Sequence, residues 1–136
     1  MIKVLVGGCF DIFHYGHLHF LKEAKKHGDY LAVLLESDTR IKKLKGRSRP
    51  IHNQDQRREI LESLKFVDEV ILTKDEMTDE DYKEVVQKFK PQIIAIEKGK
   101  KIKTHAETVN ARVVEIEKIK SLSTTSILQC GSQPSF

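Results

Sequence analysis

The chain has 136 residues, of which 39% are hydrophobic and 32% are charged, with seven Gly and three Pro. This composition allows one compact domain and excludes disordered, collagenous and disulfide-stapled classes. The longest apolar runs, such as Tyr30–Leu35, are too short to span a bilayer, and the N-terminus does not resemble a signal segment. With only Cys9 and Cys130 as cysteines, the sequence predicts a cytoplasmic protein with no membrane association.

The positive charge is concentrated in one segment. Arg40–Arg58 contains eight basic residues and one acid, whereas Lys74–Glu84 contains six acids and two lysines. A local positive field of this kind suits a polyphosphate or a nucleic acid, because it concentrates anions near the surface. A solvated lysine-rich loop is the alternative interpretation.

The first half of the chain alternates apolar runs with amphipathic segments. A helix predicted from His17 places Leu18 and Leu21 at helical spacing, and Gly28 marks its end. The basic segment is expected to be a loop. The elements expected here are a strand at Ile2–Val6, a helix at His17–Lys26, a strand at Tyr30–Leu35, a helix at Gln54–Leu64 and a strand at Val67–Leu72.

The second half continues the same alternation. Thr78 can cap a helix whose first turn is acidic and whose end is basic, and Pro91 stops it. Thr104 and Glu107 form a possible capping box for a short helix, and Ser123 could cap a last helix. The remaining elements expected are a helix at Asp79–Phe89 and strands at Ile93–Ile96 and Arg112–Ile116.

Strands that are apolar at nearly every position and alternate with helices indicate a parallel sheet covered on both faces. The sequence therefore predicts a Rossmann-like three-layer α/β/α domain with a five-stranded parallel sheet, formed by residues 1–129, and a loose tail at 130–136. Ligands in such folds bind at the carboxyl ends of the strands. We therefore expect the functional residues in the loops after Gly7, Leu35, Ile96 and Ile116.

The first of these loops contains the most specific pattern, Gly8-Cys9-Phe10-Asp11 followed by His14-Tyr15-Gly16-His17. Two histidines three residues apart at a helix start face the same side. Gly16 allows a ligand to approach the backbone, and the helix N-terminus favours an anion. The pattern predicts a phosphate-binding site.

With two further motifs, this loop resembles the cytidylyltransferase-like branch of the nucleotidyltransferases. The second motif, Leu44-Lys45-Gly46-Arg47-Ser48-Arg49-Pro50 with Gln56-Arg57, is similar to the adenylyltransferase domain of ADP-heptose synthase. The third, Leu122-Ser123-Thr124-Thr125-Ser126-Ile127, matches the family segment at the start of the final helix. The resemblance covers Lys3 to Leu128.

The resemblance implies an enzyme that joins a nucleoside triphosphate, with Mg²⁺, to a phosphorylated small molecule and releases pyrophosphate. It assigns a catalytic role to His14, His17 and Lys45. It assigns nucleotide binding to Cys9, Phe10, Asp11, Gly16, Lys42, Arg57, Ser123, Thr124 and Thr125. Packing for Cys9 and Phe10, a turn cap for Asp11 and a loop anchor for Arg57 remain open as alternatives.

The other histidines have no motif context, and His19, His27, His52 and His105 are expected at the surface. Cys9 with His14, His17 and His19 could be interpreted as a zinc site, but their spacing does not complete a tetrahedral set, so no metal ligands are assigned. Glu97–Lys101 departs from the family, since many relatives have a glycine and acids there. Ser121 stands in place of a common glycine, and Lys118 in place of an arginine.

The favoured hypothesis is transfer of AMP from ATP, rather than CMP from CTP, to a sugar phosphate. A glycerol-3-phosphate cytidylyltransferase and an archaeal-type FAD synthase are alternatives within the same class. A nucleotide-binding module without turnover is an alternative of another class. Nucleic-acid binding ranks last, because the aromatic residues do not alternate with the basic ones. A homodimer is expected from the family alone.

Overall fold

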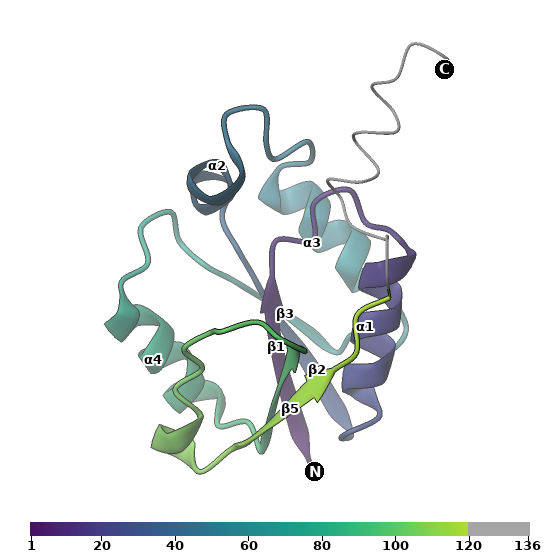
Figure 1. Ribbon diagram of the computed structural model, residues 1–136, viewed down its shortest axis with the longest axis vertical. Coiled ribbons are helices and arrows are strands. Elements are labelled where there is room, and N and C mark those ends of the chain that lie inside the picture. The colour runs from purple at the N-terminus through teal and green to yellow at the C-terminus, as the bar shows by residue number, and fades with distance from the viewer. Residues whose placement is uncertain (120–136) are drawn as a thin grey trace.

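The computed structural model describes residues 1–119 and forms a parallel sheet with helices on both faces (Figure 1). Within these residues the sheet has five strands in the order β3-β2-β1-β4-β5. The Rossmann-like α/β fold expected from the sequence is confirmed. The strands are β1 (Lys3–Gly8), β2 (Tyr30–Leu35), β3 (Glu69–Leu72), β4 (Ile93–Glu97) and β5 (Arg112–Ile116).

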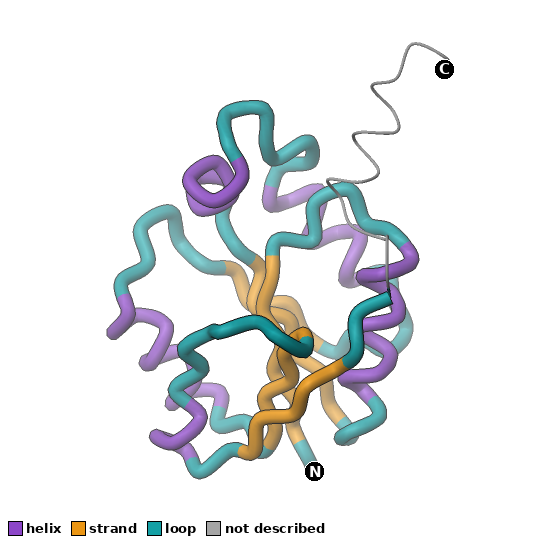
Figure 2. The backbone as a smooth tube through the Cα atoms, in the orientation of Figure 1, coloured by secondary structure: helices purple, strands orange, loops and turns teal. Residues whose placement is uncertain are grey.

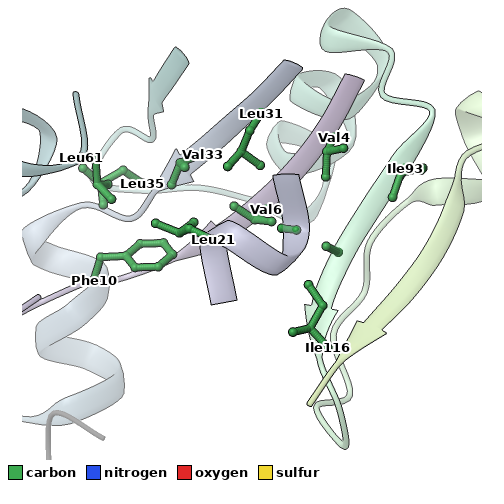
Figure 3. Close-up of a cluster of buried hydrophobic side chains, with 12 residues drawn as sticks. Val4, Val6, Phe10, Leu21, Leu31, Val33, Leu35, Leu61, Ile93 and Ile116 are labelled. Atoms are coloured by element: carbon green, nitrogen blue, oxygen red, sulfur yellow. The ribbon is translucent and has the colours of Figure 1, made fainter. Parts of the chain in front are cut away.

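Two layers of helices enclose this sheet, as Figures 1 and 2 show. Helices α1 (Tyr15–Lys25) and α3 (Gln54–Glu62) pack on one face, where Leu21 and Leu61 join the strand residues of the larger core cluster (Figure 3). Helix α4 (Asp79–Phe89) and the 3₁₀ helix η1 (Ala106–Val109) pack on the other face. No helix within residues 1–119 combines the length and apolar character needed to cross a membrane.

The helix starts follow from their caps. Thr78 caps α4, as predicted, and its cap is a capping box with Asp81. Asn53 forms the same kind of box with Gln56 at the start of α3. Lys90 adopts a left-handed conformation at the end of α4, immediately before Pro91. The first helix begins at Tyr15, two residues earlier than expected, because His14 serves as its N-cap.

Two local predictions were wrong. The basic segment is not all loop: residues Asp38–Lys45 form α2, with the Ser37 hydroxyl accepting a hydrogen bond from the Arg40 amide. Ile41 is the buried apolar residue of this helix, so its sequence lacks the periodicity that reveals a helix. The Thr104–Glu107 capping box is absent from η1 in the described structure, since Thr104 instead accepts from the Ala106 amide.

The strand order places β1 at the centre, with β2 on one side and β4 on the other. In the described residues β1 and β2 pair in register over six positions, whereas β1 and β4 pair only at Val4–Ile93 and Leu5–Ile94. From β1 to β3 the chain adds strands on one side of β1, and from β4 onward it adds them on the other side. Open α/β sheets bind ligands at this reversal, between β1 and β4.

Gly28 packs too closely for any side chain. A Cβ atom there would lie 2.6 Å from the Ile2 carbonyl oxygen and 2.7 Å from Val4 Cγ2. We expect Gly28→Ala to lower the free energy of unfolding by about 1–3 kcal/mol, measured by urea denaturation. Gly7→Ala is the matched control, because its Cβ would meet the Leu34 carbonyl at an ordinary 3.7 Å. Equal effects of the two substitutions would contradict this account.

Candidate functional site

A cavity of about 490 Å³ opens at the carboxyl ends of β1 and β4. Its walls come from both helical layers: His17 and Phe20 of α1 lie on one side, and Tyr82 and Val86 of α4 on the other. Its volume is within the range of small-molecule and cofactor sites. The sequence-predicted site residues that line it are Cys9, Phe10, His14, Gly16, His17 and Lys45.

The two motif histidines lie together at the start of α1. Their rings stack, with centroids 3.9 Å apart. His14 Nδ1 accepts a hydrogen bond from the Gly16 amide at 3.0 Å, and His17 Nδ1 accepts from the His14 amide at 3.3 Å. Each neutral ring therefore carries its proton on Nε2, which makes that atom a donor.

The Nε2 atom of His14 is buried and has no hydrogen-bond partner within residues 1–119. A buried donor without a partner costs free energy, so such an atom in a native structure requires an explanation. Its place on the wall of the cavity supplies one, because a ligand oxygen bound there would accept from it.

Both imidazoles are neutral near pH 7. Burial lowers the pKa of His17 to about 3, with further contributions from the charges of His14, Lys45 and Lys100. Burial also lowers the pKa of His14, reinforced by Lys45 and Lys118. The pair thus offers neutral N–H donors, and the surrounding lysines supply the positive charge.

These lysines come from three separate segments. Lys45 ends α2, Lys100 follows β4 and Lys118 follows β5, and all three line the cavity. Lys42 does not: it is exposed on α2, and the helix reaches the cavity through Leu44 and Lys45 in its last turn. The phosphate contact expected from Lys42 is therefore not supported by its position.

Arg57 is a loop anchor rather than a phosphate ligand. Its side chain is 0% exposed. The guanidinium donates from Nε to the His52 carbonyl at 2.9 Å and from Nη1 to the Cys9 and Glu36 carbonyls at 2.8 Å. Nη2 lies 2.7 Å from Asp38 Oδ1. The guanidinium of Arg57 is fully buried and its hydrogen bonds go to groups of the protein itself. Its position therefore does not support the nucleotide contact predicted for it.

Asp11 also has a structural role. Its carboxylate is buried and accepts from the amides of Ile51 and His52 and from Arg49 Nε, at 2.7–2.9 Å. Burial by itself would raise the pKa of Asp11, but these hydrogen bonds lower it below its ordinary value. The nucleotide contact predicted for Asp11 is thus replaced by a link between the first loop and the basic segment.

The backbone around Asp11 is strained. Phe10 and Ile12 have φ values of 47° and 52°, a region that side chains rarely adopt and that is most unfavourable for a β-branched residue. Such strain persists only where surrounding contacts fix the chain, and the bonds of Asp11 do so.

Phe10 packs within the protein and also lines the cavity. Its ring meets His17 edge to face at a centroid distance of 5.2 Å, and it lies so close to Gly8 that a Cβ there would come within 2.8 Å of the ring. Cys9 is partly buried at the cavity, and burial raises the pKa of its thiol. Phe10 thus holds the imidazole of His17 in place.

Sequence reasoning missed several residues of the cavity. His105, expected at the surface, is 3% exposed and lies near Asp79 of α4. Glu36, Arg40 and Tyr82 also line the cavity. No motif marks them, and Tyr82 lies in an acidic stretch that suggests a solvated helix. Ser123, Thr124 and Thr125 lie outside the described residues.

The described residues contain no group of three or more His, Cys, Asp or Glu side chains arranged to hold a metal ion. Cys9 and the nearby histidines therefore do not form such a group within this part of the chain.

The fold and the site together define an α/β domain with a cavity lined by histidines and lysines at its topological switch point. The chain belongs to the cytidylyltransferase-like family, whose profile matches residues 5–129. It is 38% identical over 122 residues to the FAD synthase of Thermococcus sibiricus, covering 85% of this chain and 80% of that protein. It is 38% identical over 130 residues to the bifunctional protein HldE of Campylobacter concisus, covering 93% of this chain and 26% of that protein.

A solved structure shares the fold. The lipopolysaccharide core biosynthesis protein from Thermoplasma volcanium aligns with a TM-score of 0.73 and 33% identity, over 88% of this chain and 99% of that one. Some relatives are longer: the chain spans 18% of the HldE protein of Aliarcobacter butzleri and 62% of the FAD synthase of Pyrococcus abyssi.

The role of Arg57 can be tested by substitution with lysine. One ammonium group cannot reach all the partners of the planar guanidinium, so we expect Arg57→Lys to lower the free energy of unfolding by about 3 kcal/mol or more. Arg58→Lys is the control, because Arg58 is partly exposed and its ion pairs with Asp55 and Glu62 are those of a helix surface. Similar urea midpoints for both variants would show that Arg57 is not an anchor.

The depressed pKa of His17 predicts a dependence of stability on pH. In the unfolded chain His17 binds a proton with a pKa near 6.5, whereas in the folded chain it binds this proton only at about pH 3. The free energy of unfolding therefore falls as the pH drops from about 6.5 to about 3. The loss due to His17 is at most about 5 kcal/mol. We expect His17→Asn to reduce the acid-dependent loss in urea titrations between about pH 7 and about pH 4.

The exposed His27 at the end of the same helix provides the control. His27→Asn should leave the acid-dependent loss of stability unchanged. A His17→Asn variant with the wild-type pH dependence would mean that the folded state does not hold the His17 ring neutral.

Proposed function

We propose that the chain is a nucleotidyltransferase that transfers AMP from ATP to a phosphorylated small molecule and releases pyrophosphate. The observation that carries this proposal is the buried, unpartnered Nε2 donor of His14 in a cavity lined by Lys45, Lys100 and Lys118. Membership of the cytidylyltransferase-like family and similarity to FAD synthases and HldE proteins support it.

The reaction requires placement of charge rather than removal of a proton. An oxygen of the acceptor phosphate, already ionised near pH 7, forms a bond to the α-phosphorus of ATP while the bond from that phosphorus to the pyrophosphate oxygen breaks. Catalysis then depends on alignment and on stabilising the negative charge that develops on the leaving oxygens. No general base is needed.

The histidines and lysines fit these needs. His14 and His17 would donate from Nε2 to triphosphate oxygens, and because their Nδ1 atoms are fixed by backbone amides the rings need no reorientation. Lys45 would bring a positive charge to the phosphates from α2. The N-terminus of α1, which these rings cap, adds its partial positive charge. The hydroxyls of Ser123, Thr124 and Thr125 are proposed, from the family pattern, to contact the outer phosphates.

A magnesium ion belongs to the proposal as a companion of the triphosphate. Mg²⁺ commonly binds through substrate phosphates and few protein ligands. When bound it would neutralise phosphate charge. The protein groups described above bind and orient the phosphates around it.

The donor and acceptor are proposed from the relatives. FAD contains an adenine nucleotide, so the FAD synthases among the relatives favour ATP over CTP. A sugar phosphate is the favoured acceptor, in line with similarity to HldE, and FMN or glycerol 3-phosphate are alternatives. A cytoplasmic location and a homodimer are part of the same proposal.

The test is release of pyrophosphate from ATP or CTP with Mg²⁺ and each of three acceptors: mannose 1-phosphate, glycerol 3-phosphate and FMN. With the productive pair, His14→Ala and His17→Ala should each lower kcat by about a hundredfold or more, because each removes a donor to the transition state. The control is His27→Ala at an exposed position, which should retain activity.

Two results would count against the proposal. Unchanged kcat in His14→Ala would show that the unpartnered donor is not used. Calorimetric binding of ATP without pyrophosphate release from any acceptor would favour the binding module without turnover.

A further inference from the structure

The α4 side of the cavity carries polar side chains that the proposed phosphate chemistry does not use. They come from the segment after β2, from the helices α2 and α4 and from the segment before η1, and they share one cavity with His14 and His17. They are Glu36, Arg40, Tyr82, Lys103, Thr104 and His105.

Glu36 is held firmly among them. The Tyr82 hydroxyl lies 2.9 Å from Oε2 and 3.0 Å from Oε1 of Glu36, and donates to this carboxylate. Arg40 Nε lies 3.6 Å from Oε2. The Glu36 side chain is 15% exposed, so it is largely buried but still open to a ligand in the cavity. Burial and the bond to Glu36 raise the pKa of Tyr82 to about 12, which keeps its hydroxyl protonated as a donor.

A carboxylate is unfavourable next to bound phosphates, because like charges repel. Glu36 therefore contributes to binding only through a part of the ligand that carries hydrogen-bond donors. An ionised carboxylate has about four lone-pair sites, so sites remain after Tyr82 has bound. A cationic ligand group would meet Arg40 and Lys103 on the same side of the cavity. The group that fits is a neutral hydroxyl.

A second buried polar side chain, His105, lies on the same side. His105 Nε2 is 3.1 Å from Asp79 Oδ1, and Lys103 Nζ is 2.9 Å from Asp79 Oδ2. Asp79 thus anchors Lys103 and His105 in the α4 side of the cavity.

We propose that the α4 side of the cavity binds the hydroxyl groups of a polyol phosphate acceptor, with Glu36 as the residue that selects for them. This inference rests on the proposed function and adds to it the residue that distinguishes one acceptor from another. The acceptor phosphate would lie at the histidines and its hydroxyl-bearing carbons toward Glu36. The alternative ligand for Glu36, the ribose of ATP, is an outcome of the test.

The experiment compares acceptors that have hydroxyls with one that lacks them. Mannose 1-phosphate, glycerol 3-phosphate and FMN are each assayed against n-propyl phosphate with ATP and Mg²⁺ in the wild type, Glu36→Ala, Glu36→Gln and Tyr82→Phe. For at least one polyol phosphate we expect the wild-type preference over n-propyl phosphate, as a ratio of kcat/KM, to fall by about tenfold to a hundredfold in Glu36→Ala. KM for ATP should not change.

The other variants separate ligand binding from support of the fold. Glu36→Gln keeps an acceptor for the Tyr82 hydroxyl and should lose less of the preference than Glu36→Ala. Tyr82→Phe keeps the Glu36 carboxylate but removes the hydrogen bond that positions it. We expect this variant to lose part of the preference for polyol phosphates, less than Glu36→Ala. A purely structural role would instead lower kcat/KM for polyol phosphates and n-propyl phosphate by the same factor.

Two kinetic outcomes overturn the inference: an unchanged preference in Glu36→Ala, or a rise in KM for ATP, which would assign Glu36 to the nucleoside. If ATP releases no pyrophosphate with any acceptor, the proposed function fails. Calorimetric titration with the same four phosphates then tests separately whether Glu36 contributes to binding of a polyol phosphate. Weaker binding of a polyol phosphate to Glu36→Ala, with n-propyl phosphate unchanged, would support it. Equal binding or no binding would overturn it.

Discussion

The guanidinium of Arg57 joins the loops that surround the site. From its position in α3 it reaches the carbonyl of Cys9 after β1, the carbonyl of Glu36 after β2 and the carboxylate of Asp38 at the start of α2. These hydrogen bonds connect all three segments to one buried guanidinium. Asp11 makes the complementary connection, since it accepts from the segment that leads from α2 to α3. The buried side chains of Arg57 and Asp11 thus hold together the loops after β1 and β2, the start of α2 and the segment before α3.

The chemistry of the histidines follows from that fixed backbone. The loop holds the amides of His14 and Gly16 where they donate to the two Nδ1 atoms, so the location of the ring protons is decided before any ligand arrives. Phe10, in a conformation that the bonds of Asp11 maintain, packs against the His17 ring. Burial keeps both rings neutral, and lysines from three different segments provide the charge. Donor direction and electrostatic charge are therefore supplied by separate residues.

The strands and the position of the site could be predicted because they depend on local signals. Tyr30–Leu35 is apolar at each position and forms the strand expected, and the spacing of His14 and His17 placed both at a helix start. Helix α2 was missed because Ile41 alone anchors it and its cap, Ser37, precedes a charged sequence.

The roles of Asp11 and Arg57 could not be predicted, since a charged residue in a phosphate-binding motif suggests a ligand contact, and only tertiary structure shows that the protein itself binds both. The burial of His105 depends on Asp79, 26 residues away in the chain, and no local pattern encodes such a pair.

The cavity begins where the short pairing between β1 and β4 ends. These strands are in register at Val4–Ile93 and Leu5–Ile94, and the residues beyond, from Val6 to Gly8 and from Ala95 to Glu97, line the cavity. Leu5 and Ile94 pack with Val86 of α4 in the smaller core cluster, and all three also line the cavity. The same side chains therefore belong to the hydrophobic core and to the wall that a ligand would meet. A change in their volume would alter the packing of the sheet and the space open to a ligand together.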